Sequence, residues 1–178
     1  MDRILKIFFP AAVLMSVLTG CIRDGLPDGA DLQPGDSLPE FSVTLDDGST
    51  VDTSWLRASV SCVVFFHTGC PDCRQVLPFM SELYSAYSGR VRFLFMSREE
   101  GYGDVSGYWA ENGYEMPFCA MKDRYVYSLF AREGVPRIYI SERGGLICHV
   151  FDDSQLPGRD DVEGAMLEAL GAGQPDGE

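Results

Sequence analysis

Two cysteines, Cys70 and Cys73, are separated by two residues in the segment FFHTGCPDCRQVLPF, between an apolar run and an amphipathic pattern. A pair at this spacing can exchange disulfides, hold a metal ion or staple the fold. If a helix begins at Cys70, its unpaired N–H groups and its dipole stabilise a thiolate there. Cys73 then lies one turn later on the same side, where its thiol can resolve a mixed disulfide. The spacing therefore favours disulfide exchange.

A metal site and a structural staple are the alternatives. Zinc sites usually have four ligands, often two Cys-x-x-Cys halves or a pair of histidines. This chain has one such half and the histidines His67 and His149, so no metal is expected. Of the six cysteines, three remain when Cys21 and the pair are set aside, and an odd number argues against a fully stapled scaffold. Three cysteines are predicted to be unpaired, small, buried and apolar: Cys62, Cys119 and Cys148.

The pattern along the chain predicts an α/β sandwich of three layers with a mixed central sheet and an N-terminal β-hairpin. The apolar run 60–66 suits a central strand that is covered on both faces. Helical spacing follows the cysteine pair, with an expected kink at Pro78. The pair thus falls at the first strand-to-helix junction, as in thioredoxin. Further elements are expected as a hairpin at 41–51, strands at 91–96, 118–121, 137–140 and 146–151, and helices at 105–112, 125–132 and 161–170.

The first residues are typical of a bacterial lipoprotein signal. Arg3 and Lys6 precede an apolar run that is shorter than the ~20 residues needed to span a bilayer. The following LTGC resembles a lipobox, in which cleavage leaves Cys21 as the acylated first residue. The expected organisation is a signal peptide at 1–20, a flexible tether at 21–36, a thioredoxin-like domain at 37–172 and a disordered tail at 173–178.

The chain is strongly acidic, with a formal net charge of -13. Such a surface argues against nucleic acid as a partner and against lying flat on anionic lipid. Acidity is also a common device for solubility, so it says little more about partners. Nothing in the sequence suggests a dimerisation domain, and we expect a monomer.

From about Gly35 to Leu170 the chain resembles the TlpA/ResA family of membrane-anchored, thioredoxin-like disulfide oxidoreductases. The segments that carry this resemblance are GDSLPEFSVTLDDGSTV, CVVFFHTGCPDCRQVLP, MPFCAMKD and GVPRIYISERGGLI. The resemblance implies that Pro136 is a cis-proline beside the cysteines, and that the backbone of Val135 pairs with a bound substrate chain as an added strand. It also implies an enzyme at the cell envelope, facing the periplasm, that reduces protein or small-molecule disulfides. Its electrons would come from a membrane thiol relay, and its redox centre would be the Cys70–Cys73 disulfide, with no bound cofactor.

The chain departs from the family pattern around the cysteines. Gly69 stands where many relatives have Trp, and Val64 and Val76 stand at the two positions where members often carry a proton-handling acid. Three neighbours are expected to tune the Cys70 thiol. The carboxylate of Asp72 would oppose the helix dipole, and a protonated His67 would act the other way. These three neighbours are Pro71, Asp72 and His67.

Two other functions are kept as alternatives. A thiol peroxidase of the peroxiredoxin type needs a Pro-x-x-x-Thr-x-x-Cys frame, whereas Thr68 here is two residues before Cys70 and the proline is absent. A copper carrier of the Sco type has three residues between its cysteines and a histidine late in the chain. The spacing here is two, and His149 is the only late histidine.

Overall fold

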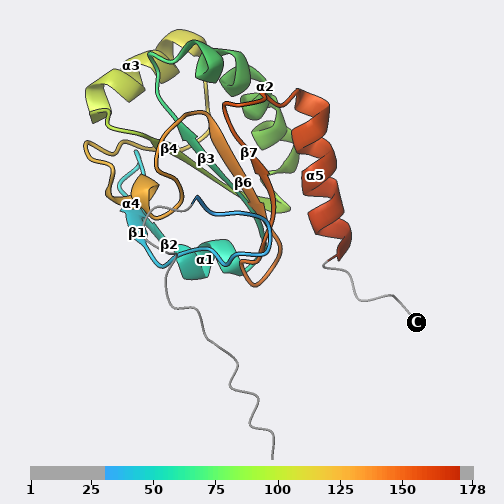
Figure 1. Ribbon diagram of the computed structural model, residues 1–178. Coiled ribbons are helices and arrows are strands. Elements are labelled where there is room, and N and C mark those ends of the chain that lie inside the picture. The colour runs from blue at the N-terminus through green and yellow to red at the C-terminus, as the bar shows by residue number, and fades with distance from the viewer. Residues whose placement is uncertain (1–30, 173–178) are drawn as a thin grey trace, which may run out of the picture.

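A mixed sheet with the strand order β5-β4-β3-β6-β7 forms the centre of the computed structural model, which describes residues 31–172 (Figure 1). The strands are β1 Ser42–Thr44, β2 Thr50–Asp52, β3 Val60–Phe66, β4 Val91–Ser97, β5 Phe118–Cys119, β6 Arg137–Ser141 and β7 Ile147–Phe151. Strands β3, β4 and β5 run parallel, whereas β6 is antiparallel to both β3 and β7. Strands β1 and β2 form a separate antiparallel pair, which is the expected hairpin.

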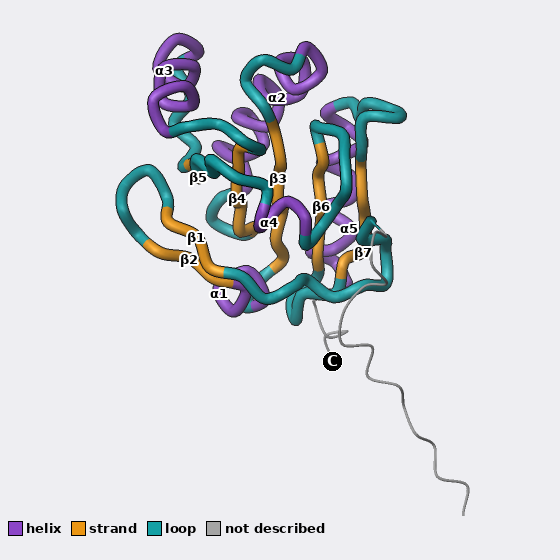
Figure 2. Tube along the Cα trace, turned by 60° about the vertical axis from the view of Figure 1, so that its left-hand side comes forward, coloured by secondary structure: helices purple, strands orange, loops and turns teal. Residues whose placement is uncertain are grey.

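Helices cover both faces of this sheet. They are α1 Thr53–Arg57, α2 Pro71–Tyr87, α3 Tyr102–Asn112, α4 Tyr125–Ser128 and α5 Arg159–Ala172. In Figures 1 and 2, α2, α3 and α5 lie on one face, while α4, α1 and the small hairpin lie on the other. The ring of Phe65 packs against Tyr127 of α4, and the next ring, Phe66, packs against Trp109 of α3. Because successive strand residues point to opposite faces, these contacts place α4 and α3 on different faces.

Strand β3 lies at the centre of the sheet, and each of its residues is buried. Its bounds are those expected from the sequence, and the three-layer thioredoxin-like arrangement is confirmed. Helix α2 continues through Pro78. Some elements differ from expectation: α4 ends at Ser128, β5 ends at Cys119, and α1 was not foreseen. Helix α1 begins where the Asp52 carboxylate accepts the N–H of Trp55 at 2.9 Å, a typical N-cap.

The segment before the hairpin is part of the folded domain. Leu32 is 3 % exposed, and its N–H donates to the carbonyl of Phe130 at 2.8 Å. The prediction of a flexible tether over 21–36 is therefore wrong for residues 31–36. The burial of Leu32 and backbone hydrogen bonds between residues 35–36 and Ile147 hold this segment, and a composition rich in Asp, Gly and Pro does not reveal them.

Several expectations concern residues outside the described part of the chain. They are the signal peptide 1–20, the acylation site Cys21, the first part of the tether and the tail 173–178. Within residues 31–172, no helix is both long and apolar enough to cross a membrane.

Candidate active site

Cys70 caps the start of α2, directly after the loop that leaves β3. Its backbone is extended, with φ −81° and ψ 123°, and its N–H donates to the carbonyl of His67 at 3.0 Å. Its own carbonyl accepts the N–H of Arg74 at 3.1 Å, which closes the first helical turn. Pro71 takes the first helical position, where a missing N–H costs no hydrogen bond. The half-buried Cys70 thiol therefore lies where the helix dipole and free N–H groups favour a thiolate.

Cys73 follows one turn later and has no exposed surface. Burial raises the pKa of its thiol far above the ordinary value, while a backbone hydrogen bond with His67 acts in the opposite direction. The charge of Asp72 makes a smaller contribution that raises the same pKa. Both cysteines of the pair are free thiols in this structure. The contrast in exposure fits an attacking role for Cys70 and a resolving role for Cys73.

The turn before β6 brings Val135 and Pro136 to the pair. The peptide bond between these residues is cis, as expected from the sequence. The Cys70 Sγ lies 3.4 Å from the carbonyl oxygen of Val135, to which the thiol donates. Strand β6 pairs with β3, and Phe65 lies opposite Arg137, so the sheet itself holds this turn beside the start of α2.

The residues that were expected to influence the Cys70 thiol come from two places, the first turn of α2 and the loop that precedes it. Asp72 is in the first turn of α2, where its carboxylate accepts a hydrogen bond from Gln75 at 3.3 Å. The ring of His67 folds back on the loop, where Nδ1 accepts the N–H of Gly69 at 3.0 Å. A Cβ at position 69 would lie 3.2 Å from this ring. Glycine, in place of the tryptophan of many relatives, therefore leaves room for His67 to take this position.

A buried acid lies close to the loop, at a position that sequence reasoning missed. Val64 and Val76, at the two positions where relatives often carry an acid, are buried apolar residues. Glu100 is buried as well, and its side chain is 5 % exposed. Its carboxylate accepts the backbone N–H of Thr68 at 2.9 Å. The predicted parallel strands could have revealed this position. Residues that follow two parallel strands, such as Thr68 after β3 and Glu100 after β4, lie at the same end of the sheet.

The remaining cysteines and the second histidine lie away from this arrangement. His149 on β7 has its Nε2 3.2 Å from Glu168 and pairs across the strands with Ile140, four positions beyond Pro136. Within residues 31–172 no three His, Cys, Asp or Glu side chains are grouped as metal ligands. Cys62, Cys119 and Cys148 are free thiols. Cys62 and Cys119 are buried as predicted, whereas the prediction is wrong for Cys148, which is half-buried on strand β7.

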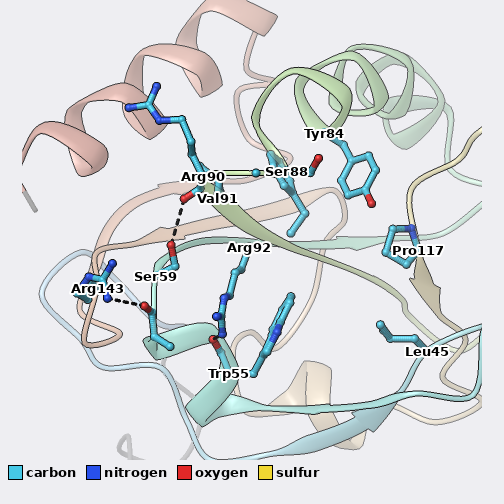
Figure 3. A pocket seen from close by; sticks show the side chains of 13 residues that line it. Leu45, Trp55, Ser59, Tyr84, Ser88, Arg90, Val91, Arg92, Pro117 and Arg143 are labelled. Carbon is cyan, nitrogen blue, oxygen red and sulfur yellow. Dashed lines mark hydrogen bonds between the residues drawn. The ribbon is translucent and has the colours of Figure 1, made fainter.

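A hollow of about 460 Å³ lies at the opposite end of the sheet, where β4 begins (Figure 3). Neither cysteine of the pair lines it. Two of the three arginines that line it are bound by the chain itself: Arg92 donates to the carbonyl of Trp55 and lies over that ring, and Arg143 donates to the carbonyl of Ala58 at 2.8 Å. The cysteine pair therefore lies at the other end of the sheet, where β3 ends, and not in this hollow.

Comparisons with known proteins agree with this geometry. The Redoxin family profile matches residues 33–145. The thiol-disulfide oxidoreductase ResA of Bacillus thuringiensis strain Al Hakam is 23% identical over 160 residues, which cover 86% of this chain and 91% of that protein. A thiol:disulfide interchange protein from Chlorobium tepidum has a similar structure, with a TM-score of 0.67, 24% identity, and coverage of 79% of this chain and 99% of that one. The thioredoxin domain of a thiol-disulfide oxidoreductase from Bacteroides vulgatus has a TM-score of 0.68 at 20% identity, with the same coverage of 79% and 99%.

The fold and the paired thiols define a thiol–disulfide oxidoreductase of the thioredoxin type. The chain belongs to the Redoxin family, and its resemblance to TlpA/ResA proteins is confirmed.

Proposed function

We propose that this protein is anchored by lipid at Cys21, faces the periplasm, and reduces disulfides in proteins. The observation that carries the proposal is the half-buried Cys70 thiol at the start of α2, with the buried Cys73 thiol one turn later. The turn at Val135 and Pro136 supports a protein substrate, because an extended chain can pair with backbone groups beside the reactive sulfur.

The reaction needs no bound cofactor. The Cys70 thiolate attacks one sulfur of the substrate disulfide, a mixed disulfide forms, and the other substrate sulfur leaves as a thiolate that takes up a proton. Cys73 then loses its proton and attacks Cys70 Sγ, which breaks the mixed disulfide and releases the second substrate thiol. Two electrons pass from the pair to the substrate, and the product is a Cys70–Cys73 disulfide.

Catalysis requires a donor that returns the pair to the dithiol. A membrane-embedded thiol relay fits a lipid-anchored protein, because both would lie at the same surface. The signal-like residues before Cys21 support export, and an exported pair needs a reductant that acts in an oxidising compartment.

The redox activity is tested with the reduced full-length protein in detergent and a protein substrate that contains one disulfide. We expect substrate thiols to appear as the pair is oxidised, and Cys70→Ser to abolish the reaction. Cys73→Ser should accumulate a mixed disulfide at Cys70, identifiable by mass spectrometry in vitro and as trapped partners in cells. Cys148→Ser is the matched control and should retain activity. Full activity of Cys70→Ser would refute the assignment.

The anchor is tested separately in cells. We expect the wild-type protein to incorporate labelled fatty acid and to partition into detergent, and Cys21→Ser to lose both properties. An unacylated wild-type protein would overturn the anchor and leave the chemistry untouched.

The alternatives have their own outcomes. Turnover of hydrogen peroxide by the purified protein would favour a peroxidase. Stoichiometric copper binding that disappears in both Cys70→Ser and His149→Ala would favour a copper carrier.

A further inference from the structure

Glu100 directly follows the turn after β4 and is the one buried carboxylate among residues 31–172. Its Oε2 accepts the N–H of Thr68 at 2.9 Å, and its Oε1 accepts the Thr68 hydroxyl. The same Oε1 lies 3.5 Å from Nδ1 of His67. Burying a carboxylate is costly unless hydrogen bonds replace its water. The N–H and hydroxyl of Thr68 therefore supply the hydrogen bonds that replace water at this carboxylate.

The loop that Glu100 contacts, 67–69, borders both cysteines. The carbonyl of His67 accepts the N–H of Cys70 at 3.0 Å, and the His67 backbone is close enough to the Cys73 thiol to affect the pKa of that thiol. One residue further on, the carbonyl of Thr68 accepts Nε of Arg74 at 2.7 Å, which ties the loop to α2. A shift of the loop would therefore move the backbone groups that orient both sulfur atoms.

We propose that Glu100 is a positioning residue for disulfide exchange, because its carboxylate holds the loop whose backbone orients Cys70 and Cys73. The proposal rests on the proposed function and adds to it a part of the machinery from another strand. Glu100 does not touch the sulfurs. It acts through Thr68, whose N–H and hydroxyl its carboxylate accepts.

The resolving step depends most on this support. The Cys70 thiol is also held by the start of α2 and by the carbonyl of Val135, so its first attack survives a looser loop. Cys73 must approach Cys70 Sγ along one line from a fully buried position, one helical turn after the Cys70 N–H that the loop holds. Small displacements of reacting groups reduce rates strongly.

The two steps can be separated by single-turnover kinetics of the reduced full-length protein with an equimolar chromogenic aromatic disulfide. The first thiolate released reports the mixed disulfide at Cys70, and the second reports its resolution by Cys73. Cys73→Ser should show only the first phase. We expect Glu100→Ala to slow the second phase at least about tenfold and the first phase by less than about threefold.

Two variants test the hydrogen bonds themselves. Glu100→Gln should restore most of the second-phase rate, because the amide oxygen can still accept the Thr68 N–H. Thr68→Val removes the hydroxyl and keeps the N–H, so we expect the second phase to slow by about threefold. Glu99→Ala is the matched control, because the Glu99 carboxylate is directed to Arg98 and Arg124, and both phases should match those of the wild type.

The results of these kinetic experiments can overturn the positioning role of Glu100 in several ways. An unchanged second phase in Glu100→Ala, equal slowing of both phases, or a Gln variant as slow as the Ala variant would each overturn the positioning role. If Glu100→Ala does not fold, Thr68→Val decides, and a wild-type second phase in that variant overturns the role. Failure of the proposed function is distinguishable, because the wild-type protein would then release no thiolate in either phase.

Discussion

Cys70 and Cys73 have the same side chain and different surroundings. Cys70 is half-buried at the start of a helix beside the carbonyl of Val135, whereas Cys73 is fully buried under the first turn of that helix. The exposed position lets a large disulfide substrate reach one sulfur only. The buried position keeps the second thiol protonated and away from competing oxidants until the mixed disulfide has formed.

This difference should appear in alkylation of the reduced protein at neutral pH. We expect iodoacetamide to modify Cys70 about tenfold faster than Cys73, since the reagent reaches only the exposed sulfur. Peptide mapping by mass spectrometry at successive times measures both rates. In urea the two rates should become similar, and equal rates in the folded protein would contradict the division of roles.

Burial of Cys73 also predicts how stability depends on pH. Burial raises the pKa of the Cys73 thiol in the folded chain above the value of about 8.5 in the unfolded chain. The stability contributed by this thiol is therefore complete below about pH 8.5 and decreases as the pH rises toward the folded value, because only the unfolded chain loses its proton. Urea unfolding of the reduced protein between pH 8.5 and 10.5 should show this decrease, by up to about 1.4 kcal/mol per pH unit for one group.

Cys73→Ala provides the comparison for this slope. The other buried thiols remain in both proteins; among them is Cys119, whose pKa burial raises to about 11. Their contributions cancel when the two slopes are subtracted. Identical slopes in the two proteins would show that Cys73 ionises as easily in the folded chain as in the unfolded one.

At the scale of elements, the segment 31–36 joins the N-terminal side of the chain to the end of the sheet that carries the cysteines. Leu32 bonds to the backbone of Phe130, and the Asp31 carboxylate lies 2.9 Å from the Arg137 guanidinium, one residue after Pro136. The chain therefore enters the domain near the turn that faces the reactive sulfur.

Packing of this segment predicts a measurable loss of stability in Leu32→Ala. The side chain is 3 % exposed, so its truncation should lower the free energy of unfolding by about 2–4 kcal/mol. Urea denaturation of the two proteins measures the difference. Gln33→Ala, at an exposed neighbour, should change it by less than about 0.5 kcal/mol. A loss as small as that of the control would mean that the segment is a tether after all.

The elements that sequence reasoning predicted well are those with long or sharp patterns. Strand β3 has seven apolar or small residues in a row, and the Asp-Gly turn identifies the hairpin. Helix α1 has five residues, too few for a helical period to be visible. Leu32 is a single apolar residue in a polar stretch, and no pattern marks its burial.

The residues of the candidate site also differ in whether a sequence pattern identifies them. Cys70 and Cys73 form a local motif whose role can be inferred from its spacing, and the role of Pro136 is implied by the family resemblance. Glu100 lies 30 positions after Cys70 in a charged run, SREEG, which is typical of an exposed turn. Only the register of β4 against β3 brings it under the loop, and burial of one of two adjacent glutamates depends on packing that composition does not encode.

At the scale of the whole molecule, the redox site belongs to a strongly acidic protein. The formal net charge is -13, with 27 acidic and 14 basic residues. The field of such a surface attracts cationic chains and repels anionic ones, and it acts on the rate of encounter more than on the chemistry. Substrate choice therefore depends on the charge around the target disulfide as well as on its accessibility.

This field predicts a salt-sensitive preference between two synthetic disulfide peptides of equal length, one flanked by lysines and the other by glutamates. At about 10 mM salt, the second-order rate constant for attack by Cys70 should be about tenfold or more higher for the lysine peptide. At about 1 M salt, screening shortens the range of the field to a few ångströms, and the two rate constants should converge. Cys73→Ser isolates this first attack, because no resolution follows it. A preference that survives high salt would point to direct contacts at the turn before β6, and an absent preference would show that the acidic surface lies too far from Cys70 to steer its substrates.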